Sequence, residues 1–191
     1  MREGRVERRT HESSVTVRVV IEGDGVLKGT SGIKFFDHLL GLIAFHGSFY
    51  IELSSTWDLR HHGVEDLSIC LGRAFGQALG ERRGIRRFGF SLVPMDEALA
   101  DVAVDLVTRP FAWVDLKVDS QVIEDMAAED IVHFYESFAM NVPCTLHMNV
   151  RYGRNEHHKV EAATKAFALA LRDASTVVPN RTAPPSSKGT V

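Results

Sequence analysis

The sequence lacks the features of disulfide-rich, membrane-spanning and secreted proteins. Its 191 residues include only two cysteines, Cys70 and Cys144, and both lie among apolar neighbours, so buried free thiols are expected. The best apolar stretch, Leu39 to Phe45, is too short to span a bilayer. The first five residues lack the apolar run of a signal peptide. We therefore expect a soluble cytoplasmic protein with no membrane partner.

An excess of basic charge is also missing. The formal net charge is −3 at pH 7, so no dominant positive field exists to attract a nucleic-acid backbone. Hydrophobic residues make up 45% and charged residues 25% of the chain, which is typical of a globular protein with a real core. The composition therefore favours a globular fold without a nucleic-acid partner.

The predicted elements follow the same order twice. In the first half, Val15 to Ile21 alternates like a strand, Gly23-Asp24-Gly25 forms a turn, and Val26-Leu27 begins a hairpin partner. A helix, a strand and a long helix follow, over residues 35–45, 49–53 and 62–79. The second half is predicted to hold three strands, a helix, a strand and a long helix, over residues 88–93, 98–107, 111–118, 129–140, 145–152 and 157–174.

This order indicates an internally duplicated α+β protein. His61 and His157, which begin the same motif, lie 96 residues apart, about half the chain. We expect a first repeat over residues 1–92 and a second over 93–178. Residues 179–191 are rich in Pro, Ser and Lys and are expected to be extended.

Each predicted long helix begins with an HHxxE motif, His61-His62-Gly63-Val64-Glu65 or His157-His158-Lys159-Val160-Glu161. Residues i and i+4 share a helix face, so His61 and Glu65 can hold one metal ion. His62 points roughly 100° away and should serve another ion. The second motif repeats this arrangement, so shared motifs would supply three ligands to each of two ions.

The donor types restrict the metal. Imidazole with carboxylate suits Mn, Fe, Co, Ni or Zn and argues against Ca, and the helix dipole disfavours imidazolium at these positions. His38, which follows Asp37, and His147, inside a predicted strand, are plausible extra ligands. The other three histidines, His11, His46 and His133, are expected to be structural or to lie on the surface.

Short segments in a fixed order resemble the imidazoleglycerol-phosphate dehydratase family, from about Arg8 to Gly189. In the first half they are Arg9-Thr10-His11-Glu12, Gly32 to His38, and His61 to Asp66. In the second they are Gly84 to Gly89, Pro94 to Leu99, Asp105 to Arg109, Leu146-His147, Gly153 to Ala162, and Ser186 to Gly189. The order and spacing of these segments make the resemblance specific.

The resemblance implies a fold, an assembly and a metal site. The helices of two α+β halves would pack together between two mixed sheets, as in folds like ribosomal protein S5 domain 2. Twenty-four subunits would assemble, with active sites at subunit contacts and two divalent ions, usually Mn²⁺, at each site. The residues at the family's ligand positions are His38, His61, His62, Glu65, His147, His157, His158 and Glu161.

The resemblance also implies a reaction of histidine biosynthesis, in which D-erythro-imidazole-glycerol phosphate loses water to give imidazole-acetol phosphate. The two ions would hold the substrate ring as imidazolate. Glu12 matches the family's acid/base carboxylate. Without the resemblance, we would interpret it as an ordinary exposed glutamate at the start of a strand. The residues that match phosphate-binding positions are Arg87, Arg109, Ser186 and Lys188.

Some positions depart from the family pattern. Gly63 replaces a usual Thr, Leu59-Arg60 replaces acidic residues, Ser13 replaces Thr, and Thr164 stands where Phe is common. None removes a proposed ligand. Two alternatives stay open: a dinuclear phosphoester hydrolase with Glu12 or Glu97 activating water, and a non-enzymatic protein whose metals only hold the assembly together.

Overall fold

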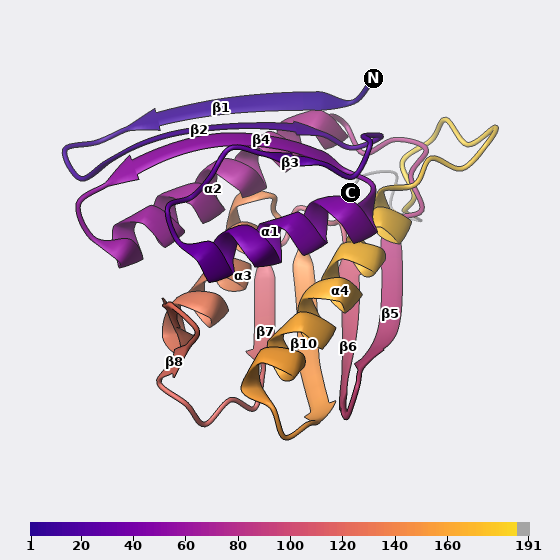
Figure 1. Ribbon diagram of the computed structural model, residues 1–191. Coiled ribbons are helices and arrows are strands. Elements are labelled where there is room, and N and C mark those ends of the chain that lie inside the picture. Colours follow the sequence, from indigo (N-terminus) through magenta and orange to yellow (C-terminus); the bar gives the residue numbers. More distant parts are fainter. Residues whose placement is uncertain (187–191) are drawn as a thin grey trace.

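The computed structural model describes residues 1–186, in which four helices lie between two four-stranded sheets (Figure 1). The elements of the first half are β1 Glu3–Arg9, β2 Ser13–Val20, β3 Leu27–Lys28, α1 Lys34–Gly47, β4 Tyr50–Trp57 and α2 Arg60–Leu79. Those of the second half are β5 Phe88–Met95, β6 Ala98–Asp105, β7 Phe111–Asp115, β8 Val122–Ile123, β9 Met126–Ala127, α3 Ala128–Asn141, β10 Thr145–Tyr152 and α4 Glu156–Ser175.

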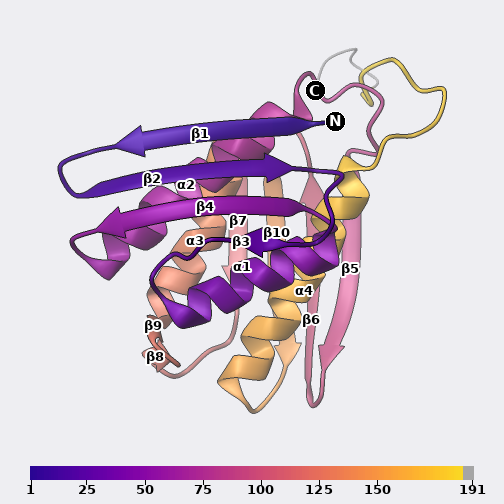
Figure 2. The same ribbon diagram turned by 45° about the horizontal axis from the view of Figure 1, so that its top comes forward.

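The first sheet has the order β1-β2-β4-β3, which Figure 2 shows from above. The alternation in β2 is real, since Val15, Val17 and Val19 are fully buried against the helices. The predicted hairpin between Val26-Leu27 and this strand is wrong: β3 pairs in parallel with β4. Both edges of β2 are already taken by β1 and β4, so β3 can pair only at the free edge of β4.

The second sheet repeats the first. Its order is β5-β6-β10-β7, with β6 antiparallel to β5 and β10, and β7 parallel to β10. Helices α1 and α3 both have 14 residues, and α2 and α4 both have 20. The predicted duplicated α+β fold is therefore confirmed. The chain passes from one repeat to the other between Leu79 and Phe88, so all of β5 belongs to the second sheet.

A matching glycine contact also marks the duplication. A Cβ on Gly4 of β1 would lie 1.9 Å from the carbonyl oxygen of Ala74 in α2, and a Cβ on Gly89 of β5 would lie 1.9 Å from that of Ala170 in α4. In both halves the first strand thus approaches the long helix closely enough that only glycine fits.

The helices form the middle of the molecule, with α2 packed on α3 and α1 packed on α4. Edge-to-face aromatic contacts join helices within and between these pairs: Phe75 of α2 lies 6.0 Å from Phe138 of α3, and Phe138 lies 5.3 Å from Phe167 of α4, between ring centroids. Cys70 and Cys144 are buried free thiols, as expected, and burial raises their pKa values to about 11 and about 12. No helix within residues 1–186 is long and apolar enough to cross a membrane.

The short hairpin of β8 and β9 was not predicted. Its Asp125 accepts hydrogen bonds from the backbone amides of Lys34 and Phe35 at 3.0 and 2.9 Å. These are orphan donors at the start of α1, whose N-cap residue Ile33 provides no side-chain bond. The hairpin of the second repeat therefore fixes the first turn of a helix of the first repeat.

Thr164 of α4, one of the departures from the family pattern, lies in the core. Its hydroxyl is 2.6 Å from that of Tyr135 in α3 and donates to the carbonyl of Val160 at 2.7 Å. Both side chains are fully buried, and burial raises the pKa of Tyr135. The threonine therefore satisfies a buried phenol that a phenylalanine would leave without a partner.

The two halves of this pair should respond unequally to mutation. Thr164→Val leaves the Tyr135 hydroxyl buried without a partner and should lower the free energy of unfolding by about 1–3 kcal/mol. Tyr135→Phe leaves Thr164 bonded to Val160 and should cost about 1 kcal/mol or less. Urea unfolding of both variants and of the double variant, which should lose less than the sum, measures the difference. An equal or larger loss in Tyr135→Phe would contradict this assignment.

Candidate metal centre

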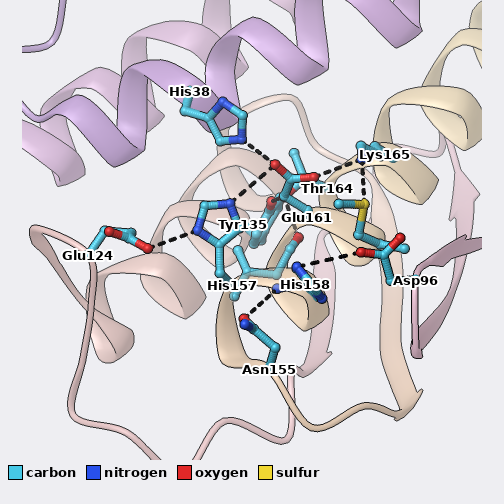
Figure 3. A network of polar contacts seen from close by, with 12 residues as sticks. His38, Asp96, Glu124, Tyr135, Asn155, His157, His158, Glu161, Thr164 and Lys165 are labelled. Carbon is cyan, nitrogen blue, oxygen red and sulfur yellow. Dashed lines mark hydrogen bonds and ion pairs between the residues drawn. The ribbon is translucent and has the colours of Figure 1, made fainter.

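The first group of potential ligands lies where α1 meets the start of α4. His38 Nε2 is 2.5 Å and His157 Nε2 is 3.2 Å from the same oxygen of Glu161, as Figure 3 shows. One ligand atom from each of the three residues lies within 4.8 Å of the others. Asn155 caps the helix by accepting from the His158 amide at 3.2 Å, which fixes the turn that carries both histidines of the motif.

Glu161 is the charged centre of this group. Burial opposes its ionisation, but hydrogen bonds from Lys165, His38 and His157 outweigh burial and hold its pKa at about 2. Lys165 Nζ lies 2.7 Å from the second carboxylate oxygen. Glu161 is thus an ionised carboxylate with two imidazoles on one oxygen, the donor set that divalent transition metals prefer.

The second group lies where α2 starts beside α3. It contains His61, Glu65 and His133, again with ligand atoms within 4.8 Å of one another. The His61 and His133 rings are 5.1 Å apart between centroids, and His133 Nε2 is 3.9 Å from Glu65. The i, i+4 arrangement expected from the sequence thus brings His61 and Glu65 together, but His133 was assigned no metal role. The feature of the sequence that could have indicated His133 is the internal repeat, because His133 follows His38 by 95 residues.

All four motif histidines share one orientation: each has Nδ1 beside a carboxylate from outside its own motif. The pairs are His61 with Asp130 at 2.6 Å, His62 with Asp58 at 2.7 Å, His157 with Glu124 at 3.0 Å and His158 with Glu97 at 2.8 Å. Metal-binding histidines commonly hold a carboxylate on one ring nitrogen while the other binds the ion. This arrangement presents Nε2 of each ring as the ligand atom.

The contacts also favour the charged form of two rings. Asp58 raises the pKa of His62, and Glu97 raises that of His158. The hydrogen bond from His158, together with hydrogen bonds from the backbone amides of Asn155 and Arg154, holds the pKa of Glu97 at about 2. A proton on Nδ1 would not compete with an ion on Nε2, but a proton on Nε2 would have to leave before an ion could bind there.

His147 lies apart from both groups. It is exposed on the outer face of the second sheet, because its neighbours Leu146 and Met148 are fully buried on the helix side. Its ring is 5.5 Å from that of Phe111. Within residues 1–186, neither group combines ligands of both HHxxE motifs, and neither contains His62, His147 or His158.

Glu12 lies in the turn between β1 and β2, beside the first motif. Its carboxylate is 3.8 Å from His62 Nδ1, and its backbone carbonyl accepts from the Asp58 amide at 3.0 Å. Glu97 holds the corresponding position in the turn between β5 and β6, beside His158. The duplication therefore places one glutamate beside the second histidine of each motif.

Three of the four residues expected to bind phosphate lie near one end of the second sheet. Arg87 is bonded to Asp105 at 2.6 and 3.0 Å and donates to the carbonyl of Pro185, next to Ser186, at 3.1 Å. Arg109 is exposed, and its carbonyl accepts from Thr145 at 3.3 Å. Lys188 lies outside the described residues.

Known proteins resemble the chain over nearly its full length. The sequence model of the family Imidazoleglycerol-phosphate dehydratase matches residues 31–171. Proteins of that name are 42% identical in Clostridioides difficile, over 99% of both chains, and 46% identical in Roseiflexus sp. strain RS-1, over 96% of this chain and 94% of the relative. The chain belongs to the imidazoleglycerol-phosphate dehydratase family. It is a hydro-lyase of histidine biosynthesis that acts on a small molecule.

Solved structures of the family share the fold. The imidazoleglycerol-phosphate dehydratase of Staphylococcus aureus is 26% identical, with a TM-score of 0.84 over 92% of this chain and 99% of that one. That of Pyrococcus furiosus, in complex with (S)-C348, is 33% identical, with a TM-score of 0.81 over 97% of this chain and 100% of that one. The arrangement of two repeats around a helical middle is therefore the family fold.

Gly63, the departure inside the first motif, has a structural reason. A Cβ at this position would lie 2.5 Å from the indole of Trp57, and that indole donates a hydrogen bond to the carbonyl of Ser31 at 2.8 Å. Trp57 thus occupies the space that a threonine would need. The glycine accommodates the tryptophan at the start of α2 and leaves His61, His62 and Glu65 in place.

Gly63→Ala should therefore destabilise the protein, by about 1–3 kcal/mol, since the added methyl must displace the Trp57 ring. Gly41→Ala is the matched control, because it lies inside α1 with no atom within 4 Å of its Cβ. That substitution should stabilise the protein by about 0.5–1 kcal/mol. Denaturant unfolding of both variants checks the opposite signs. Stabilisation by Gly63→Ala would rule out the steric role of Trp57.

Proposed function

We propose that the protein converts D-erythro-imidazole-glycerol phosphate to imidazole-acetol phosphate at a site that holds two divalent ions, Mn²⁺. The observation that carries the proposal is the shared orientation of the four motif histidines, each with Nδ1 on a carboxylate. When bound, the ions supply Lewis acidity and a template for the substrate imidazole. The reaction is proposed to take place in the cytoplasm.

The donor set fits such ions. Each group offers two imidazoles and one carboxylate, which suits Mn, Fe, Co, Ni or Zn. The proposed ligands are His38, His61, His62, Glu65, His147, His157, His158 and Glu161. The carboxylates on Nδ1 fix the tautomer and direction of the motif rings, so little reorganisation is needed on binding.

Glu12 is proposed to move the proton. The dehydration breaks a C–H bond on a carbon without an adjacent carbonyl, breaks the neighbouring C–O bond, and releases water. Glu12 is exposed and reaches into solvent beside His62, so its carboxylate can accept the proton from a substrate held at the first motif. The enol that remains becomes the ketone of the product by shifting a proton from oxygen to carbon.

The substrate phosphate is proposed to bind Arg87, Arg109, Ser186 and Lys188, with the tail of residues 179–191 completing the site. The contact of Arg87 with the Pro185 carbonyl supports this, because it ties the tail to the guanidinium. Asp105 holds two guanidinium nitrogens and raises the pKa of Arg87. The arginine is therefore fixed in one orientation and can present its remaining donors to an anion.

We propose that the active site is completed by neighbouring copies in an assembly of 24 subunits. The outer face of the second sheet carries a row of exposed aromatic residues around His147, namely Phe88, Phe90, Phe111 and Trp113. In the strand register, Phe90, Ala103, His147 and Trp113 stand side by side. An apolar patch around a potential ligand is what a protein–protein contact requires, and a copy packed there could bring a motif to His147.

Removing and restoring the metal tests the reaction. Protein treated with a chelator should lose dehydration of imidazole-glycerol phosphate, and Mn²⁺ should restore it together with about two ions per chain. Reloaded protein that assembles and binds Mn²⁺ without dehydrating this substrate would refute the proposed activity. Hydrolysis of generic phosphoesters by the same sample would then support the alternative of a dinuclear hydrolase.

Glu12→Gln tests the proton transfer separately from the metal. The variant should retain its bound Mn²⁺ and lose about 100-fold or more in kcat, the range expected when a general acid or base is removed. Glu81→Gln is the control, since that side chain is 84% exposed in the turn between α2 and β5. Unchanged turnover in Glu12→Gln would show that this glutamate does not act on the substrate.

A further inference from the structure

The turn that carries Glu12 is held at its base by a buried carboxylate. Asp66 lies in the second turn of α2, and its side chain is only 7% exposed. One of its oxygens accepts a hydrogen bond from the hydroxyl of Ser13, and the other accepts from Arg8 Nε at 2.5 Å. Arg8 is near the end of β1 and Ser13 begins β2. The Asp66 cluster, which consists of these three residues, therefore joins both strands of the turn to the helix.

Hydrogen bonds within the turn extend this support to Glu12. The hydroxyl of Thr10 accepts from the backbone amides of Glu12 and Ser13 at 3.1 and 3.0 Å, and the Thr10 amide donates to the Ser13 carbonyl at 2.9 Å. The Glu12 carbonyl accepts from the amide of Asp58 at 3.0 Å, and the Asp58 side chain holds His62. The backbone of Glu12 is thus fixed relative to the helix that begins with the first HHxxE motif.

The second repeat docks the same strands on its long helix without such a cluster. The equivalent positions follow from the matching glycines of β1 and β5, 85 residues apart, and from the two motifs, 96 residues apart. The counterparts are all apolar: Val93 for Arg8, Ala98 for Ser13 and Ala162 for Asp66. Ala98 and Ala162 are buried, and Val93 packs against the core. Docking of the strands therefore does not by itself require a buried carboxylate.

The two glutamates beside the motifs are held in different ways. The carboxylate of Glu97 accepts hydrogen bonds from His158 and from the amides of Arg154 and Asn155, so its side chain is fixed directly. The side chain of Glu12 is 58% exposed, and its carboxylate lies 3.8 Å from His62 Nδ1, beyond hydrogen-bond distance. The direction of the Glu12 side chain therefore depends on how its backbone is held, and the Asp66 cluster is present only in this repeat.

We propose that Asp66 is a positioning residue for the proton transfer, because through Ser13 and Arg8 it holds the turn that directs the Glu12 carboxylate to the substrate. The inference rests on the proposed function, since it assumes that Glu12 is the acid/base residue. An acid/base group must lie within hydrogen-bond reach of the proton that it moves. A turn released from α2 would let the carboxylate leave that position while the other residues of the site stay in place.

A purely structural role is the competing explanation, in which the Asp66 cluster only stabilises the packing of β1 and β2 on α2. Both roles predict a loss of stability when the cluster is broken, so unfolding measurements cannot separate them. Positioning predicts in addition that the effect on turnover is exerted through Glu12. The two roles therefore differ in what happens when Glu12 itself has been replaced.

Ser13→Ala breaks the cluster without changing the helix that carries the motif. It should lower kcat by about 10- to 100-fold, the range expected for a misplaced acid/base group, and leave KM and the bound Mn²⁺ unchanged. Ser13→Thr, which keeps the hydroxyl, should restore most of this loss. Ser14→Ala is the matched control, because Ser14 is the next residue of β2 and its side chain is exposed. Asp66→Asn keeps the shape of the side chain but presents a donor to one of its two partners, so it should act like Ser13→Ala.

Combining these changes with Glu12→Gln shows whether they act through Glu12. In that background Ser13→Ala should lower the residual kcat by less than about twofold, because the group that it positions is already lost. Hydrogen–deuterium exchange of a peptide covering residues 8–14 gives a readout that does not depend on turnover. Exchange should be faster in Ser13→Ala and unchanged in Ser14→Ala.

The inference is overturned if Ser13→Ala lowers kcat equally with Glu12 and with Gln at position 12, or if Ser13→Thr loses as much as Ser13→Ala. It is also overturned if the main effect is on KM or bound Mn²⁺, or if the turn exchanges no faster in Ser13→Ala than in the control. A different outcome concerns the proposed function alone. If the turn loosens as described but the unmodified protein does not dehydrate the substrate, the activity is refuted and the role of Asp66 in holding the turn stands.

Discussion

The hydrogen bond from a histidine Nδ1 to a carboxylate is the interaction on which the rest of the site depends. The start of a helix favours a neutral imidazole through its dipole, but it does not fix the direction of the ring. The carboxylates that do so come from outside the motifs: Asp58 before α2, Glu97 between β5 and β6, Glu124 in the β8–β9 hairpin and Asp130 in α3. Three of these four residues lie more than 30 residues from their histidine, so these rings are oriented only when distant segments of the chain pack together. One of the three contacts, that of Asp130 with His61, joins the two repeats.

The sequence predicted the elements with regular periodicity. Alternating valines in β2 and helical spacing in α2 and α4 express burial on one face, and burial is what periodicity reports. The parallel pairing of β3 and the β8–β9 hairpin were not predicted, because two-residue strands have no period and their partners are chosen by free sheet edges. His133 was missed for a related reason. A single half-buried histidine carries no pattern, and only its position relative to His38 in the repeat points to a role.

Three of the departures from the family pattern are matched by neighbouring residues. Gly63 provides the space that the Trp57 indole fills, and Thr164 supplies the hydrogen bond that a buried Tyr135 needs. Ser13, a third departure, donates its buried hydroxyl to Asp66, which also pairs with Arg8 at 2.5 Å. Each replacement therefore acts on the support of α2 or α4 and leaves the ligand atoms alone. A substitution inside a motif is thus better judged from the atoms its Cβ or hydroxyl meets than from the motif pattern.

The position of His147 bears on how the proposed ions acquire their remaining ligands. A single chain gathers three ligand atoms at each group, and divalent ions of this class take at least four. His62 and His158 point from helix starts beside Glu12 and Glu97, and His147 stands on the far side of a sheet from the helices. Since Leu146 and Met148 fill the helix side of β10, no rotamer of His147 can cross the sheet to reach either group. If these histidines bind the same ions, the ions must lie between copies of the chain, and metal binding and assembly then stabilise each other by mass action.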